Sequence, residues 1–211
     1  MVSYHQHTLE EHWDAIVIGS GIGGLATAAL LAKQAGRRVL VLERHYTAGG
    51  YTHAFQRPGY SWDVGVHYVG DLQQPGTPFR ALFDYITDGC LEWAPMPDVY
   101  DRVRIGDREY EFPAGADRLR QRFHGYFPGE TDAIDRYFAA VAAAVKASQL
   151  YFAEKAVPRP IARLAGGWMR SGFLRYAGRT TLDVIREFTT NPELIGLLTA
   201  QWPDYGLPPA Q

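Results

Sequence analysis

The apolar and polar positions near the start of the chain follow a strand, helix, strand pattern. Asp14 to Gly19 contains a run of β-branched residues and predicts a short buried strand. Ile22 to Ala35 is rich in Ala and Leu, which favour a helix, and Gly36 can take the left-handed conformation that ends one. Arg38 to Leu42 predicts a second buried strand. Residues 14–43 are therefore expected to form a βαβ unit with parallel strands and a right-handed crossover.

Shorter apolar runs separated by turn residues predict two hairpins further along. Residues 51–64 are expected to form the first hairpin, with the turn at Arg57 to Gly59. Val99 to Ile105 and Arg108 to Phe112 are expected to form the second, joined by the two-residue turn Gly106–Asp107.

Helical patterns dominate the second half of the chain. Asp117 to His124 predicts a short helix, which the sequence FPGE at Phe127 to Glu130 interrupts. Thr131 to Phe152 predicts a long alanine-rich helix with acids in its first turn. Thr181 to Thr189 predicts another helix that ends before Pro192.

Pro95 and Pro97 mark the expected crossing between two parts of the chain. We expect residues 1–94 to form the N-terminal part of an α/β domain of the Rossmann type, built on a parallel sheet. Residues 95–211 are expected to form part of a second, inserted α+β domain, incomplete on its C-terminal side.

Composition narrows the function classes. The chain has 211 residues, of which 46% are hydrophobic and 21% charged, as in ordinary globular proteins. The net charge of -2 gives no reason to expect a nucleic acid as partner. The single cysteine, Cys90, excludes an internal disulfide and suits a reducing compartment. The start resembles no secretory signal, and the longest apolar run, Leu25 to Ala32, is far below the roughly 20 residues of a membrane span. We therefore expect a cytoplasmic protein.

The glycines between the first strand and the helix predict a dinucleotide-binding turn. Gly19 permits the tight turn off the strand, Gly21 lets the backbone approach a pyrophosphate, and Gly24 allows close packing of helix on strand. The pyrophosphate is expected at the helix N-terminus, whose free N–H groups attract negative charge. Glu43, at the end of the second strand, is placed to accept hydrogen bonds from a ribose hydroxyl. The expected cofactor-binding residues of this region are Gly19, Ser20, Gly21, Ile22, Gly23, Gly24, Glu43 and Arg44.

The residues after the second strand bear on which dinucleotide is bound. The Glu43 carboxylate would repel a 2′-phosphate, although the neighbouring Arg44 could neutralise one; a solvated surface arginine is the simpler interpretation. Gly49 and Gly50 follow where a plain Rossmann domain would start its next helix, and paired glycines allow close backbone approach or positive φ. This departure favours a flavin over a nicotinamide dinucleotide.

Three stretches together resemble a known family. They are GSGIGGLATAALLAKQAGRRVLVLERHYTAGGYTHAF from Gly19, DVGVHYVG from Asp63, and the closing QWPDYGLPP from Gln201. They resemble the phytoene-desaturase-like flavoproteins and, more narrowly, the retinol saturase and carotenoid isomerase branch. The likeness is strong over residues 14–71, recurs at 201–209, and is a loose pattern of aromatics between them.

The resemblance implies FAD as cofactor, with NAD or NADP possible as an external reductant. The glycine run would bind the FAD pyrophosphate, Glu43 the adenosine ribose, and Gly49 and Gly50 would lie against the cofactor. The activity implied is saturation, desaturation or isomerisation of C=C bonds in an apolar polyene, with residues 95–211 shaping the substrate site. His67 and Tyr68, which by resemblance lead toward the flavin, are weak candidates for orienting substrate.

Members of this family are longer and close over the flavin ring with a C-terminal segment that is not recognisable here. We therefore expect the chain to be an N-terminal portion of a longer enzyme and to be inactive alone. Two alternatives stay open: another flavoprotein, such as an amine oxidase with a polar substrate, and a non-catalytic nucleotide-binding fragment.

Residues 155–181 contain cations interleaved with aromatic and aliphatic residues and no acid at all. This composition suits peripheral contact with an anionic membrane surface. The alternative is a domain-surface helix whose apolar face is core, although four glycines of this segment would interrupt any long helix.

No metal site is expected, because the spacing of His45, His53 and His67 does not match metal-ligand patterns. The chain also contains no nucleophile elbow, CxxC motif or paired carboxylates. Flavin chemistry requires none of these, since the ring itself would accept or donate the hydride.

Overall fold

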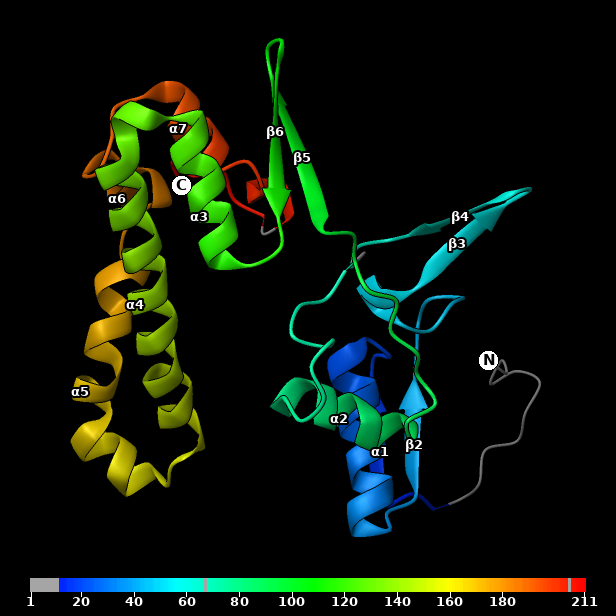
Figure 1. Cartoon of the computed structure of the whole chain (residues 1–211). Coiled ribbons are helices and arrows are strands. Elements are labelled where there is room, and N and C mark those ends of the chain that lie inside the picture. Colours follow the sequence, from blue (N-terminus) through cyan, green and yellow to red (C-terminus); the bar gives the residue numbers. More distant parts are fainter. Residues whose placement is uncertain (1–11, 67, 205) are drawn as a thin grey trace. The chain divides into compact units, whose positions relative to one another are not determined.

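The computed structural model describes residues 12–66, 68–204 and 206–211. The chain divides into two compact units, residues 1–96 and 97–211, so the division falls between Pro95 and Pro97 (Figure 1). The N-terminal unit comprises residues 1–96 and the C-terminal unit residues 97–211.

The N-terminal unit begins with the predicted βαβ arrangement. Strand β1 (Ala15–Ile18) pairs in parallel with β2 (Val39–Leu42), with Ala15 opposite Val39 and Ile18 opposite Leu42. Helix α1 (Ile22–Ala35) connects them and ends at Gly36, whose φ of 59° is left-handed, as predicted.

The expectation that β1 and β2 are buried strands is wrong: no residue of either is buried, and Leu42 of β2 is 41% exposed. Ile16 and Ile18 are 58% and 87% exposed, while the residues between and beside them are partly covered. Within the described residues this sheet consists of β1 and β2 alone, and α1 packs against these two strands. A strand in a parallel sheet is buried only where both faces of the sheet are covered, which explains the open face here.

The first predicted hairpin is present but shorter than expected. Strands β3 (Ala54–Arg57) and β4 (Tyr60–Asp63) pair antiparallel around a tight turn at Gly59, whose φ is 81°. The first strand does not begin at Tyr51, because Gly50–Thr52 forms a 3₁₀ turn, η1, closed by the Thr52 N–H donating to the Gly49 carbonyl.

Helix α2 (Pro78–Thr87) was not predicted from the sequence. Its start carries a recognisable signal: the Thr77 hydroxyl accepts from the Arg80 N–H, and Pro78 occupies the first helical position. α2 contacts α1, where the Lys33 ammonium donates to the Tyr85 carbonyl at 2.6 Å.

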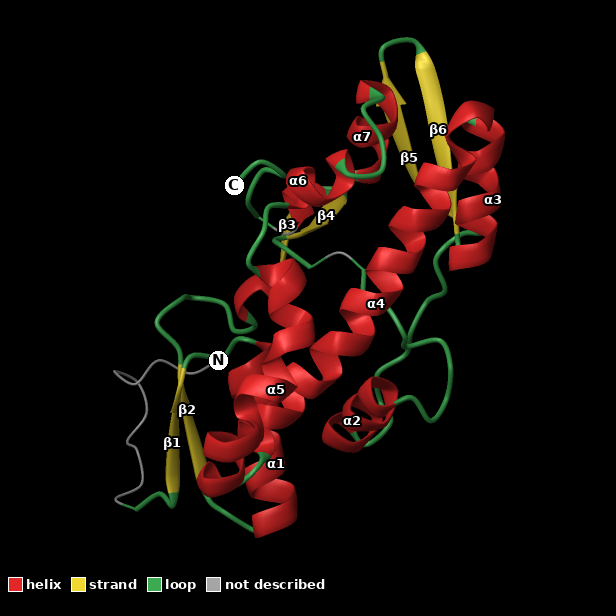
Figure 2. Ribbon diagram, turned by 90° about the vertical axis from the view of Figure 1, so that its left-hand side faces the viewer, coloured by secondary structure: helices red, strands yellow, loops and turns green. Residues whose placement is uncertain are grey.

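The C-terminal unit combines one hairpin with a set of helices (Figure 2). Strands β5 (Val99–Ile105) and β6 (Arg108–Pro113) pair antiparallel around Gly106, as predicted. The helical elements that follow are α3 (Ala116–Tyr126), the 3₁₀ turn η2 (Pro128–Glu130), α4 (Thr131–Ala156), α5 (Arg159–Ala177), α6 (Thr181–Arg186), α7 (Pro192–Leu198) and the 3₁₀ turn η3 (Trp202–Asp204).

Two expectations about these helices are corrected. Helix α5 runs through Gly166, Gly167 and Gly172 without interruption, because the first and third of these glycines lie where the helix meets α4. The predicted helix at 181–189 stops at Arg186, and the Asn191–Pro192 pair starts α7: the Asn191 side chain accepts from the N–H groups of the next turn.

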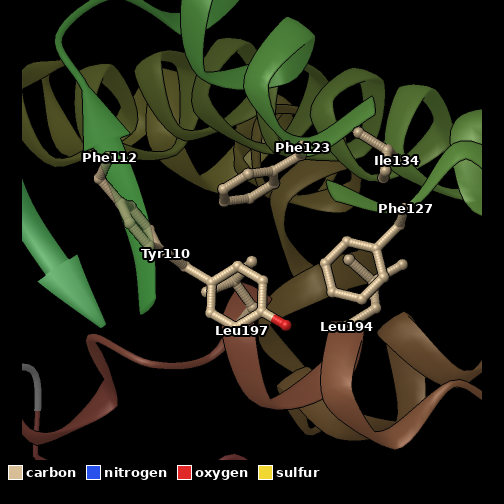
Figure 3. Close-up of a cluster of buried hydrophobic side chains, with 7 residues drawn as sticks. All are labelled: Tyr110, Phe112, Phe123, Phe127, Ile134, Leu194 and Leu197. Atoms are coloured by element: carbon tan, nitrogen blue, oxygen red, sulfur yellow. The ribbon is translucent and has the colours of Figure 1, made fainter. Parts of the chain in front are cut away.

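The core of the C-terminal unit is aromatic (Figure 3). Tyr110 on β6 stacks against Phe127, with ring centroids 5.9 Å apart, and Phe112 meets Phe123 of α3 edge-on at 5.3 Å. The buried cluster is completed by Ile134 of α4 and by two leucines of α7. The hairpin thereby closes against α3, α4 and α7.

Candidate dinucleotide-binding site

The turn between β1 and α1 depends on two glycines for backbone reasons. Gly19 has a φ of 98°, a conformation that other residues rarely adopt, and its N–H donates to the Leu42 carbonyl at 2.7 Å. A Cβ placed on Gly24 would lie 2.2 Å from the Gly19 carbonyl oxygen. The chain therefore turns sharply off β1 and starts its helix directly against that turn.

The N-terminus of α1 is open. Gly21 stands at the cap position, and no side chain in the described part of the chain caps this helix. A Cβ built on Gly21 or Gly23 would have no described heavy atom within 4 Å. Uncapped N–H groups beside free space form a place for an anion, and the helix dipole favours negative charge there.

Ser20 joins the glycine turn to the end of β2. It is only 2% exposed, and both its N–H and its hydroxyl donate to Glu43 Oε2, at 2.8 and 2.5 Å. The sequence placed Ser20 among the cofactor contacts without indicating this role. A serine within a glycine run carries no pattern that would reveal its partner.

Glu43 is held as an anion. Its Oε1 accepts from the His45 N–H at 2.7 Å, in addition to the two bonds from Ser20. The hydroxyl of Ser20, followed by the backbone N–H groups of His45 and Ser20, lowers the pKa of Glu43 to about 2. The Arg44 N–H also lowers this pKa, so Glu43 presents an anionic acceptor at the end of β2.

The pair Gly49–Gly50 lies directly against the glycine turn. Gly49 forms an isolated parallel bridge with Gly21, and its N–H donates to the carbonyl and the hydroxyl of Ser20, each at 3.1 Å. A Cβ on Gly50 would lie 3.0 Å from the Gly21 Cα. Both residues have a positive φ, 118° and 57°. Glycine is therefore favoured at these positions for two reasons, the backbone conformation and the close approach to Gly21.

The structure thus brings together the glycine turn, the start of α1, Glu43 and Gly49–Gly50, all within the N-terminal unit. Arg44 is exposed. Tyr68 is half-buried, and His67 lies outside the described residues. His45 and His53 approach within 5.1 Å between ring centroids. Among the residues that the structure describes, no group of His, Cys, Asp and Glu is arranged to hold a metal ion.

The C-terminal unit contains a pocket of a different character, with a volume of about 190 Å³. Tyr100, Phe112, Phe123 and Phe138 contribute aromatic rings to its wall, and aliphatic residues of α3, α4 and α7 supply most of the rest. The polar groups that line it include Gln201, which donates to Asp101 at 3.1 Å. Such a lining suits an apolar guest.

Comparison with known proteins agrees with this geometry. A model of NAD(P)-binding Rossmann-like domains matches residues 17–86. The chain is 39% identical to the all-trans-retinol 13,14-reductase of Danio rerio over 212 residues, 95% of this chain and 34% of that protein. It is 30% identical to prolycopene isomerase 1 of an Oncidium hybrid cultivar, over 90% of this chain and 33% of that protein. The chain is homologous to these retinoid and carotenoid enzymes.

The expected likeness to the retinol saturase and carotenoid isomerase branch is confirmed, and it extends further than the motifs indicated. The aligned region covers nearly the whole chain, including the stretch between residues 71 and 201 where the sequence showed only a loose pattern. A further Danio rerio protein, named inactive all-trans-retinol 13,14-reductase, is 31% identical over 98% of this chain and 35% of that protein. The chain spans about a third of the length of the curated relatives that it matches.

Proposed function

We propose that the chain supplies the pyrophosphate and ribose contacts of an FAD-dependent oxidoreductase that acts on C=C bonds of a polyene. The observation that carries the proposal is the junction of Gly21 with Gly49, which sets an open helix N-terminus beside the Glu43 carboxylate. An anion-binding turn next to a ribose-binding acid fits the pyrophosphate and the adenosine ribose of a dinucleotide.

The residues of the site fit FAD in the following way. The N–H groups at the start of α1 would hold the pyrophosphate, in the space beside Gly21 and Gly23. Glu43, anionic at neutral pH, would accept a hydrogen bond from a ribose hydroxyl. When bound, the flavin supplies a ring that accepts or donates a hydride. This chain's part is to fix the cofactor's nucleotide end.

FAD is favoured over a nicotinamide dinucleotide because the chain after β2 does not start a helix. It passes through Gly49 and Gly50 back onto the glycine turn, which adds a second backbone segment to the cofactor site. NAD or NADP would then act as an external reductant.

A polyene or isoprenoid lipid is the proposed substrate class. The names of the relatives specify retinol and prolycopene, both long apolar polyenes. The reaction would be saturation, desaturation or isomerisation of a C=C bond.

A non-catalytic nucleotide-binding role is the second candidate, because one relative of similar identity is named inactive. Flavin binding without any change in a polyene would support this role. Turnover of all-trans-retinol or prolycopene would exclude it.

The test of the proposal is a fluorescence titration of the purified protein with FAD. Saturable quenching is expected, and Gly21→Val should abolish it, because the valine side chain would fill the space reserved for the pyrophosphate. Gly125→Val is the matched control: its Cβ also meets no described atom within 4 Å, but it lies on α3 in the other unit. Equal FAD binding by wild type and Gly21→Val would refute the assignment of the site.

Peripheral contact of residues 155–181 with a membrane is also proposed. No helix among the described residues is long and apolar enough to cross a bilayer, so the contact would be made at the surface. The structure assigns most of this segment to α5, which is cationic and amphipathic.

A further inference from the structure

Helices α4 and α5 form a two-helix hairpin. Its outer part, residues 145–177, is covered by no other described helix or strand of the C-terminal unit. Figures 1 and 2 show the two helices side by side, with the connection at residues 157–158 lying away from β5, β6 and α3. The contact is close: Gly172 faces Ala147, and the rings of Tyr151 and Phe173 lie 4.7 Å apart.

This outer part presents positive charge alone. Between residues 137 and 182 the chain has a single acid, Glu154, which is only 7% exposed. Its Oε2 pairs with the Lys155 ammonium at 2.6 Å and its Oε1 with Arg170 at 3.5 Å, and a Cβ on Gly166 would lie 3.0 Å from it. The ion pair with Lys155 also holds the pKa of Glu154 below its ordinary value. The only negative charge is thus turned inward and neutralised.

Large apolar side chains are exposed on the same helices. Ile161, Leu164 and Trp168 follow each other at helical spacing on one face of α5, and Leu164 and Trp168 are 90% and 71% exposed. On α4, Phe152 is 63% exposed. Arg175 continues the α5 face two turns beyond Trp168.

We propose that the outer part of this hairpin, residues 145–177, is a docking surface for the headgroup region of an anionic bilayer. This deepens the proposed contact of residues 155–181 and rests on it: the surface consists of both helices, with α5 lying in the plane of the membrane. Trp168 and Leu164 enter the interface while Arg175, on the same face of α5, meets the lipid phosphates.

A bilayer fits this surface better than a protein partner does. A protein partner would have to present an acidic patch complementary to these cations together with a groove for the apolar stripe. Here the charges are all of one sign and the apolar side chains form a narrow stripe, which matches a helix lying on anionic lipid.

The test is co-sedimentation of the protein with vesicles of phosphatidylcholine alone or mixed with phosphatidylserine. Binding is expected only to the anionic vesicles and should fall as salt is raised. Arg175→Ala should weaken it about fivefold, whereas Arg104→Ala, which replaces an exposed cation on β5, should not. Leu164→Ala should also weaken binding, whereas Leu207→Ala, which is 70% exposed outside the hairpin, should not.

Absent binding, equal binding to both vesicle types, or equal effects of hairpin and control variants would overturn the proposal. FAD binding is measured in parallel on the same samples. Protein that binds FAD but no vesicles would refute this inference and leave the proposed cofactor site intact.

Discussion

Replacing Gly24 by Ala tests whether the tight junction between β1 and α1 is required. The added Cβ would lie 2.2 Å from the Gly19 carbonyl oxygen. A Cβ added to the neighbouring Gly23 would have no described heavy atom within 4 Å. Both glycines are in the first turn of α1, so an alanine gains up to about 1 kcal/mol of helix preference at either position.

The two variants should therefore differ strongly. Overpacking costs about 1–3 kcal/mol, and the upper end applies to Gly24 because the opposing atom is backbone and cannot rotate away. We expect Gly24→Ala to destabilise the N-terminal unit by about 2 kcal/mol and Gly23→Ala to stabilise it by up to about 1 kcal/mol. Urea unfolding measures the difference, and hydrogen exchange over residues 15–42 localises it. Equal stability of the two variants would show that the backbone of the turn can shift enough to accommodate the added methyl group.

Three further outcomes are expected. Hydrogen bonds lower the pKa of Glu43 from 4.5 to about 2, so its charge stabilises the folded N-terminal unit above about pH 4.5, and this stabilisation is lost as the pH falls toward 2. Ser20→Ala should make the loss of folding stability in acid smaller, and an unchanged dependence of stability on pH would argue against the Ser20 contact. Glu43→Ala should weaken FAD binding on the order of tenfold, measured by fluorescence titration, and an unchanged affinity would make Glu43 a purely structural acid. The 211-residue chain should self-associate, since Ile16 and Ile18 leave an apolar face open; a monomer by light scattering would contradict this.

The strands β1 and β2 and the helix α1 of the N-terminal unit could be predicted because each depends on neighbouring residues. The β-branched run sets β1, the Ala and Leu content sets α1, and Gly36 ends the helix through its own backbone freedom. The candidate cofactor residues followed from the same logic, since the pattern of glycines, helix and acid is local or nearly so.

Only the tertiary structure decided how distant segments contact one another. The glycines of α5 were expected to break the helix, but packing against Glu154 and Ala147 of α4 turns Gly166 and Gly172 into contact points. Burial of β1 could not be predicted either, because it depends on which elements cover the sheet and not on the apolar character of Ile16 and Ile18. The partners of Ser20 belong to the same class: the sequence determines that a hydroxyl is present, while its bonds to Glu43 and Gly49 exist only because folding brings three segments together.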